Sequence, residues 1–285
     1  MKTEIIDLSQ KEYSLIKDLV YEKFGISLGE NKKSLVMGRL NKVLRGNGFS
    51  SFREYYNYLI SDTSGEAVST LINRISTNHT FFFFFHAHFD YLINNSLPLL
   101  LNAMKKRGER TLRIWSCGCS SGEEAYTIAM LLQEFLEQSS ETVEVAILAT
   151  DISKDALDKG RAGLYSRENI ERLPVKLRHK YFKTIDKNGY KLSEKIQRMV
   201  MFRRLNLMTN VFPFKQKFHS IFCRNVMIYF DTQTRLQLLS KLRNSLVPEG
   251  NLFLGLSESL GRSNDDYYYI QPGVYGNAEA RKKSQ

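Results

Sequence analysis

The sequence has few cysteines and no long apolar run, and both shortages exclude whole classes of protein. Its 285 residues include three cysteines, Cys117, Cys119 and Cys223, which argues against a disulfide framework and for reduced thiols in the cytoplasm. Cys117 and Cys119 lack the second pair of ligands that a zinc site needs, so we expect no metal. No stretch approaches the roughly 20 apolar residues of a membrane span. Residues 1–10 lack the apolar core of a signal peptide, so we expect a cytoplasmic protein that does not insert into a membrane.

Acidic residues are too few to balance the basic ones, which leaves a formal net charge of +11 and a pI near 9.4. A field of this sign attracts either the phosphates of a nucleic acid or an acidic protein partner. The sequence contains no RRM, KH or zinc-finger signature. It also has no mixed aromatic and basic platform away from a run of phenylalanines. We therefore expect an acidic protein partner and no nucleic acid, with an RNA substrate as the alternative that net charge alone supports.

The stretch of residues 112–129 (LRIWSCGCSSGEEAYTIA) predicts a strand, a turn of small residues and a helix. This order is typical of ligand binding by a doubly wound sheet, and Gly118 and Gly122 allow a ligand to approach the backbone closely. The turn is neither GxGxxG nor a phosphate loop. Glu123 and Glu124 at the start of the helix would repel phosphate and favour a cationic ligand. An equally consistent interpretation is that they only offset the helix dipole.

A second apolar run, residues 143–149 (VEVAILA), is followed by Thr150 and Asp151. An acidic residue at the end of the second strand commonly binds ribose hydroxyls, although Asp151 would also suit the cap of the next helix. The spacing of about 30 residues from the glycine turn favours ribose binding. A ribose together with a cation, and without phosphates, describes S-adenosylmethionine.

Residues 1–75 are predicted to form a helical N-terminal domain that docks onto a partner. Within it, residues 32–45 (KKSLVMGRLNKVLR) form an amphipathic helix with Leu35, Val36, Leu40 and Leu44 on one side. No carboxylate lies in this segment to balance its charge, which favours a docking surface over a merely solvated face. The basic residues of the docking face are Lys32, Lys33, Arg39, Lys42 and Arg45.

Residues 76–90 are predicted to be a linker that contributes to the cofactor site, and 91–276 the α/β domain. The linker carries five consecutive phenylalanines, Phe81 to Phe85, which cannot all be buried on one face of a regular element. We interpret His86 and His88 as structural, because a third metal ligand is missing. Further expectations are helices at 89–107, 152–166 and 232–246, an inserted β-subdomain at about 164–203 with a hairpin turn at 184–189, strands at 190–192, 200–203, 219–223, 251–256 and 267–275, and a disordered tail at 277–285.

Several motifs together resemble the chemotaxis receptor glutamate O-methyltransferases, the CheR family, along nearly the whole chain. The motifs are residues 115–124 (WSCGCSSGEE), 149–152 (ATDI), 206–207 (NL), 223–230 (CRNVMIYF) and 255–259 (GLSES). The resemblance implies a Rossmann-like methyltransferase domain of the α/β class that binds S-adenosylmethionine. This domain would carry a small antiparallel β-subdomain and follow an all-α N-terminal domain.

The resemblance also implies roles for individual residues. Tyr229 would lie next to the transferred methyl group, and the basic helix would meet the cytoplasmic methylation helices of a chemotaxis receptor. A glutamate side chain has a pKa near ~4.3 and is already ionised at neutral pH, so methyl transfer to it requires no general base. The residues expected around the cofactor are Asn78, Thr80, Glu123, Asp151, Asn206, Leu207, Cys223 and Arg224.

One departure from the family pattern concerns the linker. The family usually has Phe-Phe-Arg-Glu where this chain has four phenylalanines, so Phe84 stands in the place of an arginine and Phe85 in the place of a glutamate. Phenylalanine provides neither the charge nor the hydrogen bonds of arginine. Two interpretations follow: an active glutamate methyltransferase, or a relative that binds cofactor or receptor without methylating.

A second departure concerns the loop between Phe182 and Tyr190. Some family members carry a longer, glycine-containing loop there and recognise a pentapeptide at the receptor's C-terminus. The loop here (KTIDKNG) has one glycine, Gly189, and is shorter. We therefore expect that the protein does not depend on a receptor pentapeptide and reaches its substrate through the basic N-terminal face.

Overall fold

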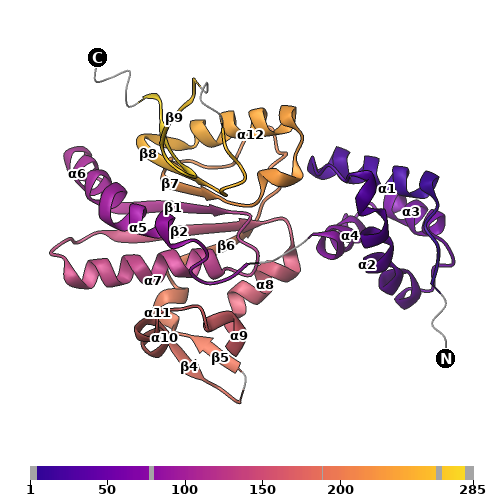
Figure 1. Cartoon of the computed structure of the whole chain (residues 1–285), viewed down its shortest axis with the longest axis horizontal. Helices are drawn as coiled ribbons and strands as arrows, with labels where there is room; N and C mark the ends of the chain where they lie inside the picture. The colour runs from indigo at the N-terminus through magenta and orange to yellow at the C-terminus, as the bar shows by residue number, and fades with distance from the viewer. Residues whose placement is uncertain (1–4, 77–79, 188, 261–264, 280–285) are drawn as a thin grey trace.

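A computed structural model describes residues 5–76, 80–187, 189–260 and 265–279. The chain forms a helical N-terminal unit beside a larger α/β unit (Figure 1). None of the described helices is long and apolar enough to cross a bilayer. The N-terminal elements are α1 (Gln10–Phe24), the 3-10 turn η1 (Glu30–Lys32), α2 (Lys33–Gly46), α3 (Phe52–Ser61) and α4 (Glu66–Ile75).

Local sequence signals set the ends of α1. The hydroxyl of Ser9 accepts a hydrogen bond from the Glu12 amide, and the Glu12 carboxylate accepts one from the Ser9 amide, which forms a capping box. Gly25 ends the helix in the left-handed region at φ 68°. The predicted basic helix is found as η1 and α2. Leu35, expected to face inward, is 37% exposed, whereas Val36 and Leu40 are buried.

A seven-stranded sheet in the order β6-β2-β1-β7-β8-β10-β9 forms the centre of the α/β unit. The first five strands of this order pair in parallel, and β10 and β9 pair antiparallel. This arrangement confirms the predicted Rossmann-like fold. The strands are β1 (Thr111–Cys117), β2 (Glu144–Asp151), β6 (Val200–Arg204), β7 (Phe218–Cys223), β8 (Leu246–Leu254), β9 (Tyr267–Gln271) and β10 (Val274–Asn277).

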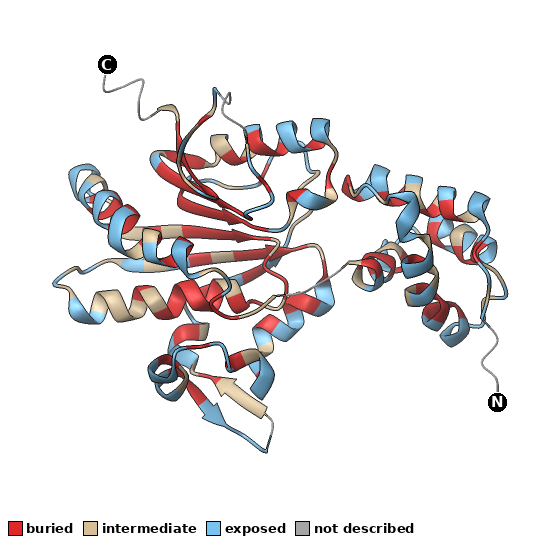
Figure 2. Ribbon diagram, in the orientation of Figure 1, coloured by how far each residue is buried: buried red, intermediate tan, exposed pale blue. Residues whose placement is uncertain are grey.

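Helices cover both faces of this sheet, and β1, β7, β8 and β10 are buried along most of their length, whereas β2, β6 and β9 are partly exposed (Figure 2). Alternation along the strands divides the core. Ile114 packs on the side of α7, whereas the neighbouring Trp115 packs on the side of α12. The helices are α5 (His86–Tyr91), the π-helical turn η2 (Leu92–Ser96), α6 (Leu97–Arg107), α7 (Glu123–Gln138), α8 (Lys154–Ala162), the 3-10 turn η3 (Met227–Tyr229) and α12 (Thr232–Asn244).

A small antiparallel sheet in the order β3-β5-β4 forms the predicted β-subdomain. The expected turn at 184–189 joins β4 and β5, and the Ile185 amide donates to the Gly189 carbonyl. The predicted extent was wrong at its end, because residues 200–204 form β6 and pair with β2 in the large sheet. The elements are β3 (Leu164–Ser166), α9 (Arg167–Ile170), α10 (Val175–Tyr181), β4 (Phe182–Thr184), β5 (Gly189–Leu192) and α11 (Glu194–Gln197).

Three further boundaries differ from the sequence prediction. The helix expected at 152–166 ends at Ala162, because Gly163 adopts the left-handed conformation and the chain continues as β3. The single strand expected at 267–275 is two, since Gly273 turns the chain between β9 and β10. The tail expected to be disordered from residue 277 is ordered at its start. Asn277 is buried and donates to the carbonyls of Leu246 and Val247.

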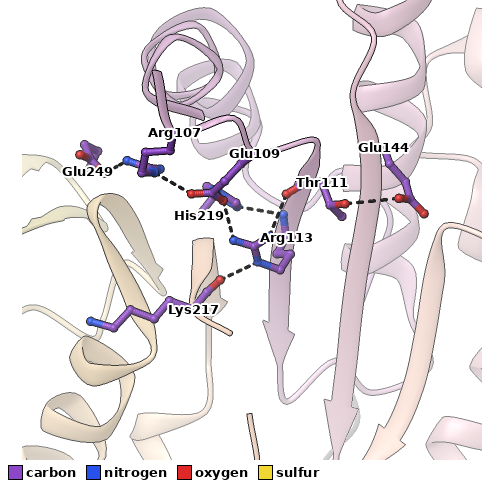
Figure 3. Close-up of polar contacts among 8 residues, drawn as sticks. All are labelled: Arg107, Glu109, Thr111, Arg113, Glu144, Lys217, His219 and Glu249. Carbon is purple, nitrogen blue, oxygen red and sulfur yellow. Dashed lines mark hydrogen bonds and ion pairs between the residues drawn. The ribbon is translucent and has the colours of Figure 1, made fainter. Parts of the chain in front are cut away.

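A charged cluster fixes the edge of the sheet where β1 and β7 begin (Figure 3). The Glu109 carboxylate accepts hydrogen bonds from Arg107 at 2.6 Å and Arg113 at 2.7 Å. Nδ1 of buried His219 accepts the Arg113 amide, so Nε2 carries the proton that faces Glu109 at 3.1 Å. Burial raises the pKa of Glu109, but the two arginines outweigh it and hold that pKa at about 2.

We expect Glu109→Gln to lower the free energy of unfolding by about 1–2 kcal/mol at pH 7, because charge-assisted hydrogen bonds are lost. Because the pKa of Glu109 is lower in the folded state, its ionised carboxylate stabilises the fold at pH values above the unfolded pKa of about 4.3. This stabilisation is lost as the pH falls towards 2. Urea unfolding should therefore show a smaller difference in the free energy of unfolding between wild type and Glu109→Gln at pH 4 than at pH 7. Glu144→Gln is the matched control, since exposed Glu144 contacts only the Thr111 hydroxyl in this cluster. An equal loss of unfolding free energy in both variants would show that the hydrogen bonds of Glu109 with Arg107 and Arg113 do not stabilise the fold.

Candidate functional site

A cavity of about 340 Å³ opens where the parallel strands end and the N-terminal unit meets the α/β unit. Four segments at or directly after strand ends form its floor: the turn after β1, the end of β2, the residues after β6 and the loop after β7. This is the edge at which doubly wound sheets bind ligands. The floor residues are Gly118, Cys119, Ser120, Thr150, Asp151, Ile152, Leu205, Asn206, Leu207, Arg224, Asn225 and Val226.

The glycine turn presents bare backbone to the cavity. Gly118 has φ 71°, and a Cβ there would lie 2.4 Å from Cγ2 of Val226. The amides of Gly118 and Cys119 both donate to the Thr150 carbonyl, which ties the turn to the end of β2. The predicted close approach of a ligand is therefore supported by a left-handed backbone that a larger residue would strain.

Asp151 lies at the end of β2 and faces the cavity. Its Oδ2 accepts the Ser120 amide at 2.8 Å, and its Oδ1 accepts the Ser153 amide at 2.9 Å. Burial raises the pKa of Asp151, and these backbone hydrogen bonds oppose the rise. Each carboxylate oxygen keeps a second lone pair, so the side chain can still accept hydrogen bonds from ligand hydroxyls.

The two glutamates at the start of α7 have different environments. Glu123 does not line the cavity; it is 2% exposed and accepts hydrogen bonds from the Ser121 hydroxyl. Burial raises its pKa to about 7. Glu124 does line the cavity, accepts the Ser116 hydroxyl at 2.8 Å and pairs with Arg224 at 3.1 Å. The sequence singled out both residues, but the family resemblance selected Glu123.

Arg224 joins three parts of the cavity wall. Its Nη1 pairs with Glu124, and its Nη2 donates to the Phe84 carbonyl at 2.6 Å. In the described part of the chain, its Nε and the Ser120 hydroxyl are buried without a hydrogen-bond partner. Buried polar atoms of this kind are satisfied when a polar ligand is bound. Together with the Asp151 carboxylate and the bare turn, they fit S-adenosylmethionine.

Positive φ angles allow the five consecutive phenylalanines to point in different directions. Phe82 and Phe83 enter the core, whereas Phe84 is 46% exposed and lines the cavity. Phe83 and Phe85 have φ of 58° and 67°, which turns successive rings in different directions. Phe85 packs edge-on against His88, and Nε2 of His88 lies 3.0 Å from the Pro272 carbonyl.

The N-terminal unit closes the cavity through the segment that follows α1. The Ser27 amide donates to the Tyr229 carbonyl at 2.8 Å, and Ile26 forms an antiparallel bridge with Phe230. The Asn206 side chain donates to the Lys23 carbonyl at 2.7 Å. Tyr229 is thus placed by contacts from both units, which its sequence position alone did not indicate.

The loop that carries Tyr229 is held by a residue whose role the sequence did not reveal. The buried Glu258 carboxylate accepts the amides of Asn225 at 2.7 Å, Ile228 at 3.2 Å and Gly255 at 2.7 Å. The GLSES motif contains this glutamate, but only the contacts show that it organises the loop.

The structure brings together most of the residues that the family resemblance suggested. Cys223 is fully buried in the core on the α12 side and does not line the cavity. Asn78 lies outside the described residues. Those that line the cavity are Thr80, Asp151, Asn206, Leu207, Arg224 and Tyr229.

The expected docking residues do not form one uniform face. Lys32 lines the cavity, and Lys42 and Arg45 are exposed on α2. Arg39 is half-buried and donates to the carbonyls of Ile75 and Ser76, so it holds the end of α4. Its assignment to a free docking surface was wrong in this respect. Lys33 is half-buried at the start of α2.

Comparison with known proteins agrees with this architecture. The CheR methyltransferase all-alpha domain matches residues 11–76, and the CheR methyltransferase SAM binding domain matches residues 78–275. A chemotaxis protein methyltransferase of Borreliella burgdorferi is 44% identical and covers 95% of both chains. Chemotaxis protein methyltransferase 2 of Pseudomonas aeruginosa is 36% identical over 95% of this chain and 94% of that protein. The chemotaxis protein methyltransferase of Escherichia coli is 35% identical over 90% of this chain and 87% of that protein.

These matches confirm the family and the S-adenosylmethionine-binding domain that the sequence predicted. They extend over both units, so the cavity lies between the two domains that define the family. The chain belongs to the CheR methyltransferase family.

Proposed function

We propose that this protein transfers a methyl group from S-adenosylmethionine to glutamate side chains in the cytoplasmic methylation helices of chemotaxis receptors. The observation that carries the proposal is the cavity shared by the two matched domains, in which Asp151 and Tyr229 face the same space. The names of the relatives support the receptor as substrate. Three free, buried cysteines are consistent with a reducing cytoplasm.

The chain's own residues have a limited chemical task in this reaction. S-adenosylmethionine supplies a methyl group on a cationic sulfur. With the cofactor bound, a glutamate carboxylate oxygen would bond to that methyl carbon as the carbon–sulfur bond breaks, and the electron pair of the broken bond would stay on sulfur. No proton is transferred, so the site must orient the carboxylate and exclude water. Asp151 would hold the ribose hydroxyls, and Ser120 and Arg224 would offer hydrogen-bond donors to the cofactor.

The direct test is incorporation of a labelled methyl group into receptor cytoplasmic fragments. Label on glutamate should be released as methanol by mild alkali, because esters hydrolyse and N-methyl groups do not. Receptor in which the methylation-site glutamates are replaced by glutamine is the matched control. Label in RNA rather than in the receptor would instead support the alternative that net charge suggested.

A second candidate function is a relative that binds cofactor or receptor without methylating. Phe84 favours it, since it lines the cavity where the family usually has an arginine. Calorimetry with S-adenosylhomocysteine, run beside the incorporation assay, distinguishes the two. Cofactor binding without incorporated label would support this second candidate. Methyl transfer gained by the variant Phe84→Arg, Phe85→Glu would then show that these two phenylalanines cause the inactivity.

We further propose that the receptor is reached through the exposed basic side chains of α2 and not through a C-terminal pentapeptide. The short β4–β5 turn supports this, because Gly189 donates to the Asp186 side chain at 2.6 Å and closes the loop tightly. The strands β3 and β4 flank β5 and form the edges of the small sheet.

We expect Lys42→Glu, Arg45→Glu to weaken receptor association by about tenfold at low salt, because both side chains are exposed and face an acidic partner. The loss should shrink at 0.5 M salt, while affinity for S-adenosylhomocysteine stays the same. Receptor fragments with and without the C-terminal pentapeptide should bind equally. A clear gain from the tail, lost when residues 186–189 are altered, would contradict the proposal.

A further inference from the structure

The charged side chains that line the cavity are not all paired with one another. Among the described residues, four charged side chains form its wall: Lys32, Glu124, Asp151 and Arg224. Glu124 and Arg224 pair with each other at 3.1 Å. Asp151 accepts two backbone amides and serves the ribose. Lys32 is the one cation of this set with no ion pair in the described part of the chain.

Local contacts fix the turn that carries Lys32. The hydroxyl of buried Tyr13 donates to the Gly29 carbonyl at 2.7 Å, directly before η1. The neighbouring carboxylate of Glu30 is paired with Lys17 at 3.0 Å and accepts a hydrogen bond from the side-chain amide of Gln10 at 2.6 Å. The acidic residue closest in sequence therefore does not neutralise Lys32, and the ammonium group remains available to a ligand.

Lys32 is itself exposed, and apolar side chains line the same cavity. Leu28 and Leu35 line the cavity from the same segment of the chain, and Phe84 lines it from the linker. An ion pair formed beside such a wall is less screened than one on an open surface. A carboxylate that enters the cavity there meets one free cation.

Methyl transfer needs that cation for a specific reason. An apolar wall disfavours the ionised form of an entering carboxylate and raises its pKa, and the protonated acid is a poor nucleophile. A nearby cation opposes this shift. The family usually places an arginine at the position of Phe84, beside the cofactor, and Phe84 supplies no cation to this part of the cavity.

We propose that Lys32 holds the substrate glutamate carboxylate, ionised and oriented, and takes over the charge that Phe84 does not provide. Lys32 is thus a positioning residue for the reaction, and it favours glutamate over glutamine at the methylated position. This inference rests on the proposed methylation of receptor glutamates.

The test compares Lys32→Gln with Lys11→Gln, which changes an exposed lysine of α1 that does not line the cavity. Lys32→Gln should lower kcat by about tenfold or more and move the acidic limb of the kcat profile to higher pH. Affinity for S-adenosylhomocysteine should not change. Lys11→Gln should leave kcat and its pH profile as in the wild type. Lys32→Arg should restore most of the activity, and so should Phe84→Arg added to Lys32→Gln.

Three results would overturn the assignment. A matching loss of S-adenosylhomocysteine affinity would place Lys32 at the cofactor. Equal effects of Lys32→Gln and Lys11→Gln would show that only the net charge of the N-terminal unit matters. An unchanged pH profile would show that it does not keep the carboxylate ionised. If the wild type transfers no methyl group, the proposed function fails, and Lys32 is tested by binding. With S-adenosylhomocysteine bound, the wild type should prefer a glutamate-containing receptor peptide over its glutamine counterpart, and Lys32→Gln should not; no preference in the wild type would end the proposal.

Discussion

Replacing Arg224 with methionine should lower the free energy of unfolding by about 3–5 kcal/mol at pH 8, because it removes the partner of the Glu124 carboxylate, whose side chain is only 14% exposed. Arg224 also donates to the Phe84 carbonyl, so the linker loses a contact in the same variant. Methionine keeps much of the apolar stem, and the loss is therefore mainly electrostatic. Chemical unfolding followed by the fluorescence of Trp115, the single tryptophan, measures it.

The destabilisation should depend on pH in a defined direction. Burial raises the pKa of Glu124 in the wild type, and Arg224 and Ser116 oppose the rise. Without Arg224 the folded-state pKa rises further, so above about pH 4.5 the folded state binds more protons than the unfolded state. Stability of the variant must then fall as pH rises, and the loss should be smaller at pH 5 than at pH 8.

The double variant Glu124→Gln, Arg224→Met is the control for this interpretation. Removing both charges should recover most of the lost stability, because no unpaired charge remains buried. If the double variant is as unstable as the sum of the single variants, the two side chains are not energetically coupled. A stability loss that does not vary with pH would likewise exclude an unpaired Glu124 as its cause.

The elements around the cavity that the sequence predicted depend on local signals. The small residues after β1 and the acidic residue at the end of β2 are read directly from the order of apolar and polar positions. Gly118 is required because φ 71° and the contact with Val226 exclude a side chain. Signals of this kind involve neighbouring residues, so they can be recognised without knowledge of the tertiary structure.

The choice between Glu123 and Glu124 illustrates what local signals cannot decide. Successive residues on an α-helix point about 100° apart, so adjacent glutamates face different surroundings. Which of them faces the cavity depends on how α7 rotates against the sheet, and that rotation is set by packing. Glu124 faces Arg224, a residue 100 positions away.

Long-range pairing explains the other differences. Residues 200–204 follow the β-subdomain directly, so their sequence position suggested membership of that subdomain, yet they pair with β2 some 50 residues earlier. The hydrogen bond between Ser27 and Tyr229 likewise joins segments about 200 residues apart. Amphipathic patterns predict that such elements exist and leave open which partner each will find.

Asp151→Ala should weaken the binding of S-adenosylhomocysteine by ten- to a hundredfold, since two charge-assisted hydrogen bonds to ribose hydroxyls are worth about 1.5–3 kcal/mol. The side chain also accepts the Ser120 and Ser153 amides, so the variant disturbs the glycine turn as well. A fall in affinity alone therefore does not separate ribose binding from a collapsed turn. Asp158→Ala is the matched control, because Asp158 is an exposed acidic residue on the adjacent α8.

An analogue of S-adenosylhomocysteine that lacks both ribose hydroxyls separates the two effects. The wild type should bind S-adenosylhomocysteine far more tightly than this analogue, because only S-adenosylhomocysteine has ribose hydroxyls that can donate hydrogen bonds to Asp151. In Asp151→Ala the two ligands should bind with similar affinity, whereas a disturbed turn would weaken both and preserve their ratio. Calorimetry gives all four affinities, and Trp115 Nε1, which donates to the Thr150 hydroxyl at 2.8 Å beside the site, reports through fluorescence whether the end of β2 keeps its structure. A preserved ratio in a variant with unchanged Trp115 fluorescence would show that Asp151 does not bind the ribose.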